Sequence, residues 1–267
     1  MKILVLAPFG KCEPFGDENL MKVKRQDTQF SFECLFDVFP LPYNTYIYNT
    51  LKCINAATER CIKAEKEGYD AVVLSCMLDP GLLEARNVVD IPVTAAFEAS
   101  AHLACMMAKR YSVVTTDAMT GSGIDMRLVD FYGVRQKLAS IRWINITANQ
   151  LYPEITPTEE VARRVTAVSK KCVEEDGAEL IIPGCTIIGS LCTKMFKEDA
   201  MKAIGVPVID PQLVAFKQAE MMVDLQKLAG YPAVSRYGLW RKGPQEEYEQ
   251  FRKWMKEHPS PEQYYQK

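Results

Sequence analysis

Two cysteines occupy the same position in two parts of the chain that resemble each other. Cys76 ends the segment that begins at Gly68, and Cys185 ends the matching segment that begins at Gly177. An offset of 109 residues separates both the glycines and the cysteines, and the same offset aligns Ile3 to Pro8 with Ser112 to Asp117. Two equivalent thiols on two equivalent half-domains suggest a pair that faces one substrate from opposite sides.

Such a pair suits the inversion of a carbon atom next to a carbonyl group. One group removes the proton to give a planar enolate, and the other returns a proton to the opposite face. A thiol has a reference pKa of about 8.5 that can be brought toward neutrality. We expect a helix to start at Asp79 and Pro80 after Cys76, and another at Ser190 after Cys185. These helix N-termini would lower the thiol pKa values, and their N–H groups would stabilise the enolate oxygen.

The other cysteines have an ordinary structural interpretation. Cysteine is a small hydrophobic residue that is commonly buried. Four of the others fall within expected helices and three have no counterpart in the other half, so we assign all seven to packing: Cys53, Cys61, Cys105, Cys172, Cys12, Cys34 and Cys192. The matched position is what sets Cys76 and Cys185 apart.

Composition excludes several classes of function. A net charge of −2 gives no electrostatic case for a nucleic acid or an anionic membrane as partner, and no apolar run reaches the length of a membrane span. Nine cysteines without a secretion signal argue for reduced thiols and a cytoplasmic location. With two histidines and no Cys-x-x-Cys motif, we expect no metal site and no cofactor, and a small molecule as substrate.

Alternating strand and helix patterns predict an α/β fold with mostly parallel sheets. The expected strands are 2–7, 29–38, 70–75, a strand from 91, 111–116, 140–146, 179–182 and 206–210, and the expected helices are 45–67, 98–108, one from a capping box at 156–159, and 190–204. Residues 12–27 are expected to form a loop. Both cysteines follow strands, at the sheet edge where ligands collect in such folds.

The segment from Gly230 to Lys267 has no counterpart in the first half. A helix is expected over 244–258, with apolar residues at helical spacing. This helix either packs on its own domain or forms an arm at a subunit interface, and the sequence leaves both open. We expect a homo-oligomer.

Five segments together resemble the aspartate/glutamate/hydantoin racemase superfamily, and within it the hydantoin and allantoin racemases most. They are 76–82, 91–99, 111–116, 177–186 and 205–210, and the likeness runs from Met1 to about Leu228. The resemblance implies two pseudo-symmetric doubly wound lobes, a cofactor-independent two-cysteine mechanism and an active site in the cleft between the lobes. It also implies a C-terminal segment that returns to the first lobe, so we expect 1–98 plus 210–267 as the first lobe and 99–209 as the second.

The resemblance also implies roles for individual residues. Cys76 and Cys185 would be the acid/base pair. Met77 and Thr186 would offer backbone N–H groups to the substrate carbonyl, and Thr115 and Thr116 would contact polar groups of a substrate ring.

The chain departs from the family's pattern around these residues. The family's first strand usually ends in an Asn-Pro-Asn turn that helps to hold the substrate, and here that turn is Ala7, Pro8 and Phe9. Hydantoin racemases tend to have Phe-Gly after the first cysteine, where this chain has Met77 and Leu78. Both changes make the pocket more apolar or differently shaped, so the substrate need not be a hydantoin itself.

We therefore expect a racemase or epimerase that acts on a hydantoin- or allantoin-like substrate. Two alternatives stay open. One is cis–trans isomerisation through a covalent cysteine adduct, as in the maleate isomerases. The other is a non-catalytic protein that binds a small molecule.

Overall fold

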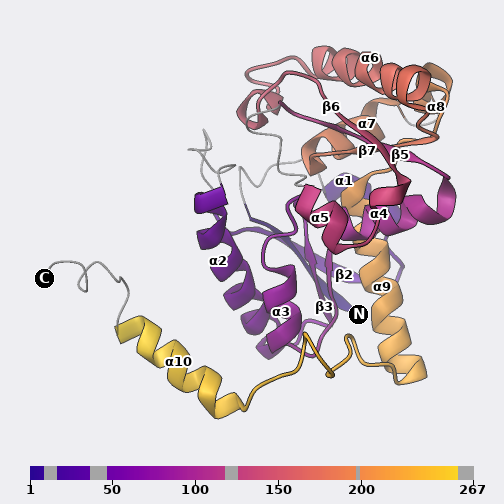
Figure 1. The fold of residues 1–267 in the computed structure, drawn as a ribbon. Coiled ribbons are helices and arrows are strands. Elements are labelled where there is room, and N and C mark those ends of the chain that lie inside the picture. Colours follow the sequence, from indigo (N-terminus) through magenta and orange to yellow (C-terminus); the bar gives the residue numbers. More distant parts are fainter. Residues whose placement is uncertain (9–16, 37–46, 118–125, 197–198, 258–267) are drawn as a thin grey trace, which may run out of the picture.

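Two parallel β-sheets, each covered by helices, make up the computed structural model (Figure 1). It describes residues 1–8, 17–36, 47–117, 126–196 and 199–257. The first sheet has the order β2-β1-β3-β4, and the second has the order β6-β5-β7. The strands are β1 (Lys2–Ala7), β2 (Gln29–Cys34), β3 (Ala71–Leu74), β4 (Val93–Ala95), β5 (Tyr111–Thr115), β6 (Leu138–Trp143) and β7 (Leu180–Pro183).

Helices follow most strands, as the alternation in the sequence predicts. They are α1 (Asp17–Val23), α2 (Ile47–Lys66), α3 (Leu82–Val88), α4 (Ala96–Met107), α5 (Met126–Phe131), α6 (Thr158–Asp176), α7 (Thr186–Phe196), α8 (Asp199–Ile204), α9 (Pro211–Ala229) and α10 (Gln245–Glu257). Two short 3₁₀ helices are η1 (Arg135–Lys137) and η2 (Ala148–Leu151).

The repeat in the sequence is a repeat in the structure. Strands β1, β2 and β3 begin at Lys2, Gln29 and Ala71, and β5, β6 and β7 each begin 109 residues later. In both sheets the first strand of the repeat lies in the middle and pairs in parallel with the other two. The prediction of an α/β fold with two lobes and parallel sheets is confirmed.

Helix α4 lies between the two sheets and contributes to both cores. Its Ala99 packs with β1, β3 and Phe216 of α9. Its Phe97, Ala101 and Ala104 instead pack with the strands of the second sheet, β5 and β7. The outer face of the first sheet is covered by α2 and α3, and that of the second sheet by α6 and α7. The hydrophobic cores of both halves therefore depend on this one helix.

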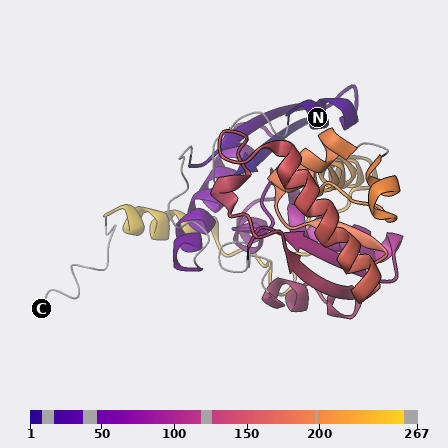
Figure 2. The ribbon, with the colours of Figure 1, turned by 90° about the horizontal axis from the view of Figure 1, so that it is seen from above.

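The C-terminal segment packs on α2 and α3 of its own chain. The Asn87 side chain donates to the carbonyl groups of Leu239 and Arg241, and Arg252 pairs with Glu59. Helix α10 lies at the periphery in both views (Figures 1 and 2). It leaves large apolar side chains exposed, Phe251 among them. The homo-oligomer expected from the sequence stays a prediction.

No helix in the described ranges is long and apolar enough to cross a membrane.

Four predictions about parts of the chain away from the two matched cysteines are wrong. Part of the expected loop at 12–27 is helix α1, whose Leu20 is fully buried beneath β1 and α9. The strand expected at 206–210 is reduced to one bridge between Val208 and Ile181. The capping box expected at 156–159 is absent, since α6 begins at Thr158 without a side-chain cap. The expectation of reduced thiols fails at Cys34, which is disulfide-bonded, whereas seven other described cysteines are free.

Candidate active site

The carboxyl ends of β3 and β7 meet, and each leads directly to one of the matched cysteines. Cys76 follows β3 by two residues and Cys185 follows β7 by two residues. The Thr186 hydroxyl lies 3.4 Å from the backbone oxygen of Ser75, a contact between the two strand ends. The Cys185 thiol is also close enough to raise the pKa of Cys76. The structure therefore brings the two cysteines together, and both are partly exposed.

Cys185 occupies the position just before the first residue of α7. Its sulfur accepts hydrogen bonds from the backbone N–H groups of Ile187 and Ile188, which lower the pKa of the thiol. Serine and threonine oxygens make the same contacts when they cap helices. The helix thus starts at Thr186 rather than at Ser190, which brings its N-terminus directly to the thiol.

Gly189 lies where α7 closely approaches the start of α9. A Cβ atom on Gly189 would lie 2.6 Å from Cδ of Pro211, closer than carbon atoms pack.

Cys76 lies in a turn and not at a helix N-terminus. The Leu78 N–H donates to its sulfur, and the Asp79 N–H donates to its backbone oxygen at 3.1 Å. Asp79 has a left-handed backbone with φ of 44°, and Gly81 at φ 82° precedes the first residue of α3. The prediction that Asp79 and Pro80 start the helix is therefore wrong.

The pKa values of both thiols are raised above their ordinary value. Burial is the largest cause at each cysteine and outweighs the backbone hydrogen bonds that lower the pKa. At Cys76 the neighbouring Cys185 and Asp79 raise the pKa further. The expectation that helix N-termini bring these thiols toward neutrality is therefore wrong.

Asp79 makes long-range contacts that the sequence does not reveal. One carboxylate oxygen accepts the Phe97 N–H at 2.9 Å, and the other accepts the Glu98 N–H at 2.8 Å and the Tyr132 hydroxyl at 2.9 Å. These N–H groups belong to the first turn of α4, whose preceding residue Ala95 has no capping side chain. Burial, the largest cause, raises the pKa of Asp79 to about 7.

A second buried carboxylate, Asp210, lies between α7 and α9. It caps α9 by accepting the Gln212 N–H at 3.0 Å, and it accepts the Thr193 hydroxyl of α7 at 2.9 Å. Burial raises the pKa of Asp210 to about 6. Gln212 in turn accepts the Ser75 hydroxyl at 2.8 Å. This network connects α7 and α9 to the end of β3.

The expected substrate-binding side chains are largely buried. Thr115 donates to the backbone oxygen of Gly184 at 3.2 Å, and Thr116 is 2% exposed. Met77 is 4% exposed and packs in the core beneath α4.

Of the two substrate-binding residues expected in the turn after β1, the structure describes one. Pro8 is buried at the end of β1, and Phe9 lies outside the described residues. The roles assigned to all these residues in binding a substrate stay predictions.

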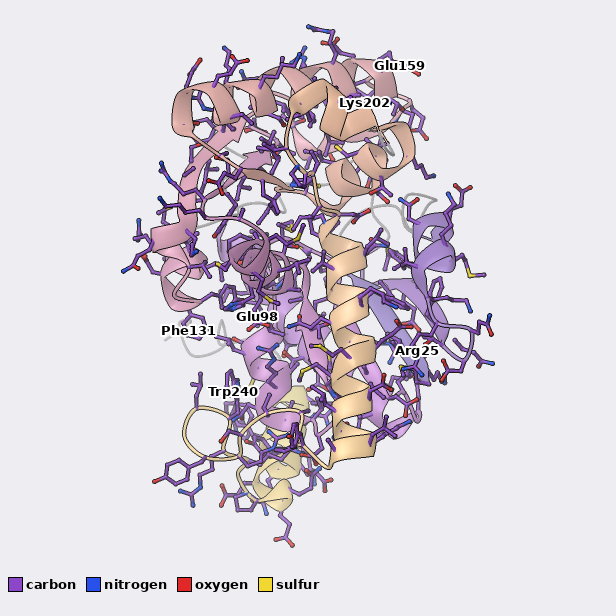
Figure 3. The ribbon with its side chains drawn as sticks, turned by 90° about the vertical axis from the view of Figure 1, so that its right-hand side faces the viewer. Arg25, Glu98, Phe131, Glu159, Lys202 and Trp240 are labelled. Atoms are coloured by element: carbon purple, nitrogen blue, oxygen red, sulfur yellow. The ribbon has the colours of Figure 1, made fainter. Side chains whose placement is uncertain are left out.

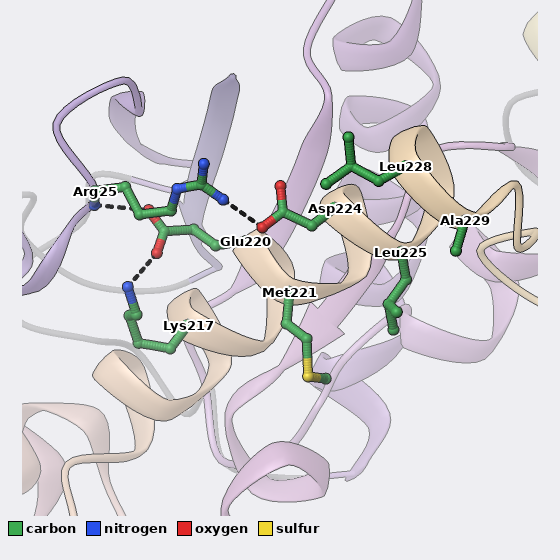
Figure 4. A pocket seen from close by; sticks show the side chains of 8 residues that line it. All are labelled: Arg25, Lys217, Glu220, Met221, Asp224, Leu225, Leu228 and Ala229. Atoms are coloured by element: carbon green, nitrogen blue, oxygen red, sulfur yellow. Dashed lines mark hydrogen bonds and ion pairs between the residues drawn. The ribbon is translucent and has the colours of Figure 1, made fainter.

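In the ranges that the structure describes, no group of three or more histidine, cysteine or acidic residues is placed to hold a metal ion. A surface pocket of about 350 Å³ lies along α9 (Figure 4). Its charged groups are paired with one another, Lys217 with Glu220 and Arg25 with Asp224. We therefore place no chemistry there.

Comparison with known proteins gives consistent results at three levels. Residues 28–219 match the family model described as Asp/Glu/Hydantoin racemase. A hydantoin racemase from Pseudomonas sp. (strain NS671) is 37% identical over 180 residues, which cover 67% of this chain and 69% of that protein. A hydantoin racemase from Rhizobium meliloti is 34% identical over 169 residues, 63% of this chain and 65% of that protein.

The fold is shared with solved structures. An allantoin racemase from Klebsiella pneumoniae aligns with a TM-score of 0.77 at 25% identity, covering 91% of this chain and 94% of that one. A glutamate racemase from Bacillus anthracis aligns with a TM-score of 0.58 at 16% identity, covering 85% of this chain and 82% of that one, which shows likeness of fold alone.

Proposed function

Because the chain belongs to the Asp/Glu/hydantoin racemase family, whose members are isomerases, we propose that it inverts a carbon atom next to a carbonyl group. The proposed substrate is a small molecule with a hydantoin- or allantoin-like ring. The names of the similar proteins support this class, since they are hydantoin racemases and an allantoin racemase.

The observation that carries the proposal is the meeting of two matched thiols at the ends of β3 and β7. In the proposed reaction, one cysteine as thiolate takes the proton from the substrate carbon, and the electron pair of the broken C–H bond passes into the enolate. The other cysteine as thiol gives its proton to the opposite face of the same carbon. The thiolate then lies on the second cysteine, so the reverse reaction uses the same pair with the roles exchanged.

Cys185 is our choice for the thiolate at rest. Two backbone N–H groups donate to its sulfur, against one for Cys76. Asp79 also lies near Cys76, and its negative charge opposes ionisation there. Hydrogen bonds to the charged form favour it, and a neighbouring negative charge disfavours it. Ionisation therefore costs less at Cys185.

The remaining assignments follow the family's pattern. We propose that the backbone N–H groups of Met77 and Thr186 stabilise the enolate oxygen, because each directly follows one of the two cysteines. Thr115 and Thr116 would contact polar groups of the ring, and Pro8 and Phe9 would form an apolar wall.

The test is proton exchange in deuterated water. Chiral hydantoins, allantoin and amino acids are incubated with the protein while NMR follows the α-proton and polarimetry follows inversion. We expect Cys76→Ser and Cys185→Ser each to abolish inversion while still allowing exchange in one enantiomer. Cys172→Ser, at a buried cysteine in the core of the second sheet, is the matched control and should racemise normally.

Three outcomes would contradict parts of the proposal. Normal racemisation by both single variants would refute the two-thiol mechanism and leave the racemase activity standing. Isomerisation of maleate, without racemisation of any compound in the panel, would instead assign the chain to the cis–trans isomerases. Binding of a panel compound without any turnover would identify a binding protein.

A further inference from the structure

The turn that holds Cys76 is strained and is fixed by a hydrogen bond within it. Asp79 closes the turn by donating its N–H to the backbone oxygen of Cys76 at 3.1 Å. Its left-handed backbone, with φ of 44°, is uncommon for a residue other than glycine. Such a conformation persists only where surrounding contacts hold it in place. Those contacts come from the Asp79 carboxylate.

The carboxylate supplies the missing cap of α4. Ala95 precedes this helix and offers no side-chain acceptor, so the N–H groups of the first turn need a partner from elsewhere in the chain. Asp79 accepts from Phe97 and Glu98, the second and third residues of the helix. A carboxylate at a helix N-terminus also interacts favourably with the helix dipole. The Cys76 turn is thereby attached to α4.

The third partner of the carboxylate comes from the other half of the molecule. Tyr132 follows α5, and its hydroxyl donates to Asp79 at 2.9 Å. Its ring lies 6.0 Å from the ring of Phe97 and 5.5 Å from that of Phe131. Figure 3 shows Glu98 and Phe131 near each other, midway between the ends of the molecule. Tyr132 also packs against the core that contains β7, the strand that leads to Cys185.

The surroundings leave the carboxylate little freedom to move. Asp79 is 6% exposed. Arg86 forms two hydrogen bonds to the Glu98 carboxylate, at 2.7 and 2.5 Å, which hold the first turn of α4 against α3. Met77, next to the thiol, is buried in the same core as Phe97. The turn therefore cannot shift without moving α4 or Tyr132.

We propose that Asp79 is a positioning residue for Cys76, which fixes the distance between the two thiols by tying the Cys76 turn to α4 and to Tyr132. This inference rests on the proposed function, because it assumes that both thiols act on one substrate. The carboxylate does not touch the substrate. Besides the effect of its charge on the Cys76 pKa, it acts on geometry, and small displacements of a reacting group have large effects on rate.

The test combines turnover with the reactivity of each thiol. We expect Asp79→Asn to lower kcat about 100-fold and Tyr132→Phe to lower it about tenfold, with KM changed less than about threefold in both. Asp79→Glu keeps the charge but moves the carboxylate by one methylene group, and it should not restore kcat. Asp176→Asn, which removes a carboxylate bound to Arg142 and Ser140 at the far end of the second sheet, should retain wild-type kcat.

Alkylation by iodoacetamide, followed peptide by peptide with mass spectrometry, reports on each cysteine separately. Release of the turn admits water to the thiol, so iodoacetamide should react with Cys76 about ten times faster in Asp79→Asn and also in Asp79→Glu, which keeps the charge, while Cys185 reacts at an unchanged rate. Equal changes at both cysteines, or an unchanged kcat, would overturn the proposal. If the wild-type protein racemises nothing in the panel, the proposed function fails, while the alkylation rates still decide whether Asp79 positions Cys76. Tyr132→Phe keeps the test informative if Asp79→Asn does not fold.

Discussion

The buried carboxylate of Asp79 sets an expected dependence of stability on pH. Its pKa is raised from an ordinary 3.8 to about 7 in the folded protein, with burial as the largest cause. The folded state therefore holds this proton more tightly than the unfolded chain does. The stabilisation is complete below about pH 4 and is lost as the pH rises through about 7. One pKa unit corresponds to about 1.4 kcal/mol, so the change amounts to about 4 kcal/mol at most.

The Asp79→Asn variant isolates this contribution because asparagine is uncharged at every pH. The free energy of unfolding is measured with urea for both proteins at several pH values between 4.5 and 8. We expect the stability of the wild type relative to the variant to fall by about 1.4 kcal/mol per pH unit up to about pH 7. Across the range this corresponds to a relative shift in Tm of roughly 8 °C or more.

A control with the opposite sign is available in the same chain. The Arg142 guanidinium holds the pKa of Asp176 below its ordinary value, so that carboxylate stabilises the fold above about pH 4. The free energy of unfolding of the wild type relative to Asp176→Asn should therefore not fall as the pH rises. The stability of the wild type relative to Asp79→Asn could also stay constant or rise with pH. In that case the three hydrogen-bond donors, which lower the pKa of Asp79, outweigh burial, which raises it. The carboxylate would in that case be ionised throughout, and the reasoning above would be refuted.

Three further predictions concern packing, charge and catalysis. Gly189→Ala should lower the free energy of unfolding by about 1–3 kcal/mol, measured with urea, because the new Cβ would meet Pro211 at 2.6 Å. Arg86→Met should cost about 3–5 kcal/mol in the same measurement, because it leaves the Glu98 carboxylate buried without its partner. If the thiols act as proposed, kcat/KM should rise about tenfold per pH unit from pH 6 to 8, because both thiol pKa values are raised. A profile that is flat over this range would contradict that ionisation.

The sequence predicted the features that repeat and missed those that depend on one long-range contact. The strands of the first and second sheets were recognisable because apolar runs recur at a fixed offset, and both cysteines follow such runs. Asp79 and Pro80 have the residue types of a helix start, but the Asp79 side chain caps α4 rather than its own neighbours. The residues around Asp79 cannot show that α4, a distant helix in the sequence, lacks a capping side chain of its own.

The raised pKa values of the two thiols could not be predicted from the sequence for a related reason. A helix N-terminus lowers a thiol pKa, and one does lie at Cys185. Its effect is smaller than that of burial, which depends on how α4, α7 and α9 close over the strand ends. One signal was present in the sequence. Ala95 precedes α4 and cannot cap it, so the capping side chain had to come from another part of the chain.

The position of α4 between the sheets has a consequence for how the chain unfolds. Ala99 is part of the core of one sheet, while Phe97 and Ala101 are part of the core of the other. Loss of this helix would expose apolar surface in both halves at once, so neither half retains a complete core without the other. Although the halves repeat each other in sequence, we expect them to melt in a single cooperative transition and not as two independent domains.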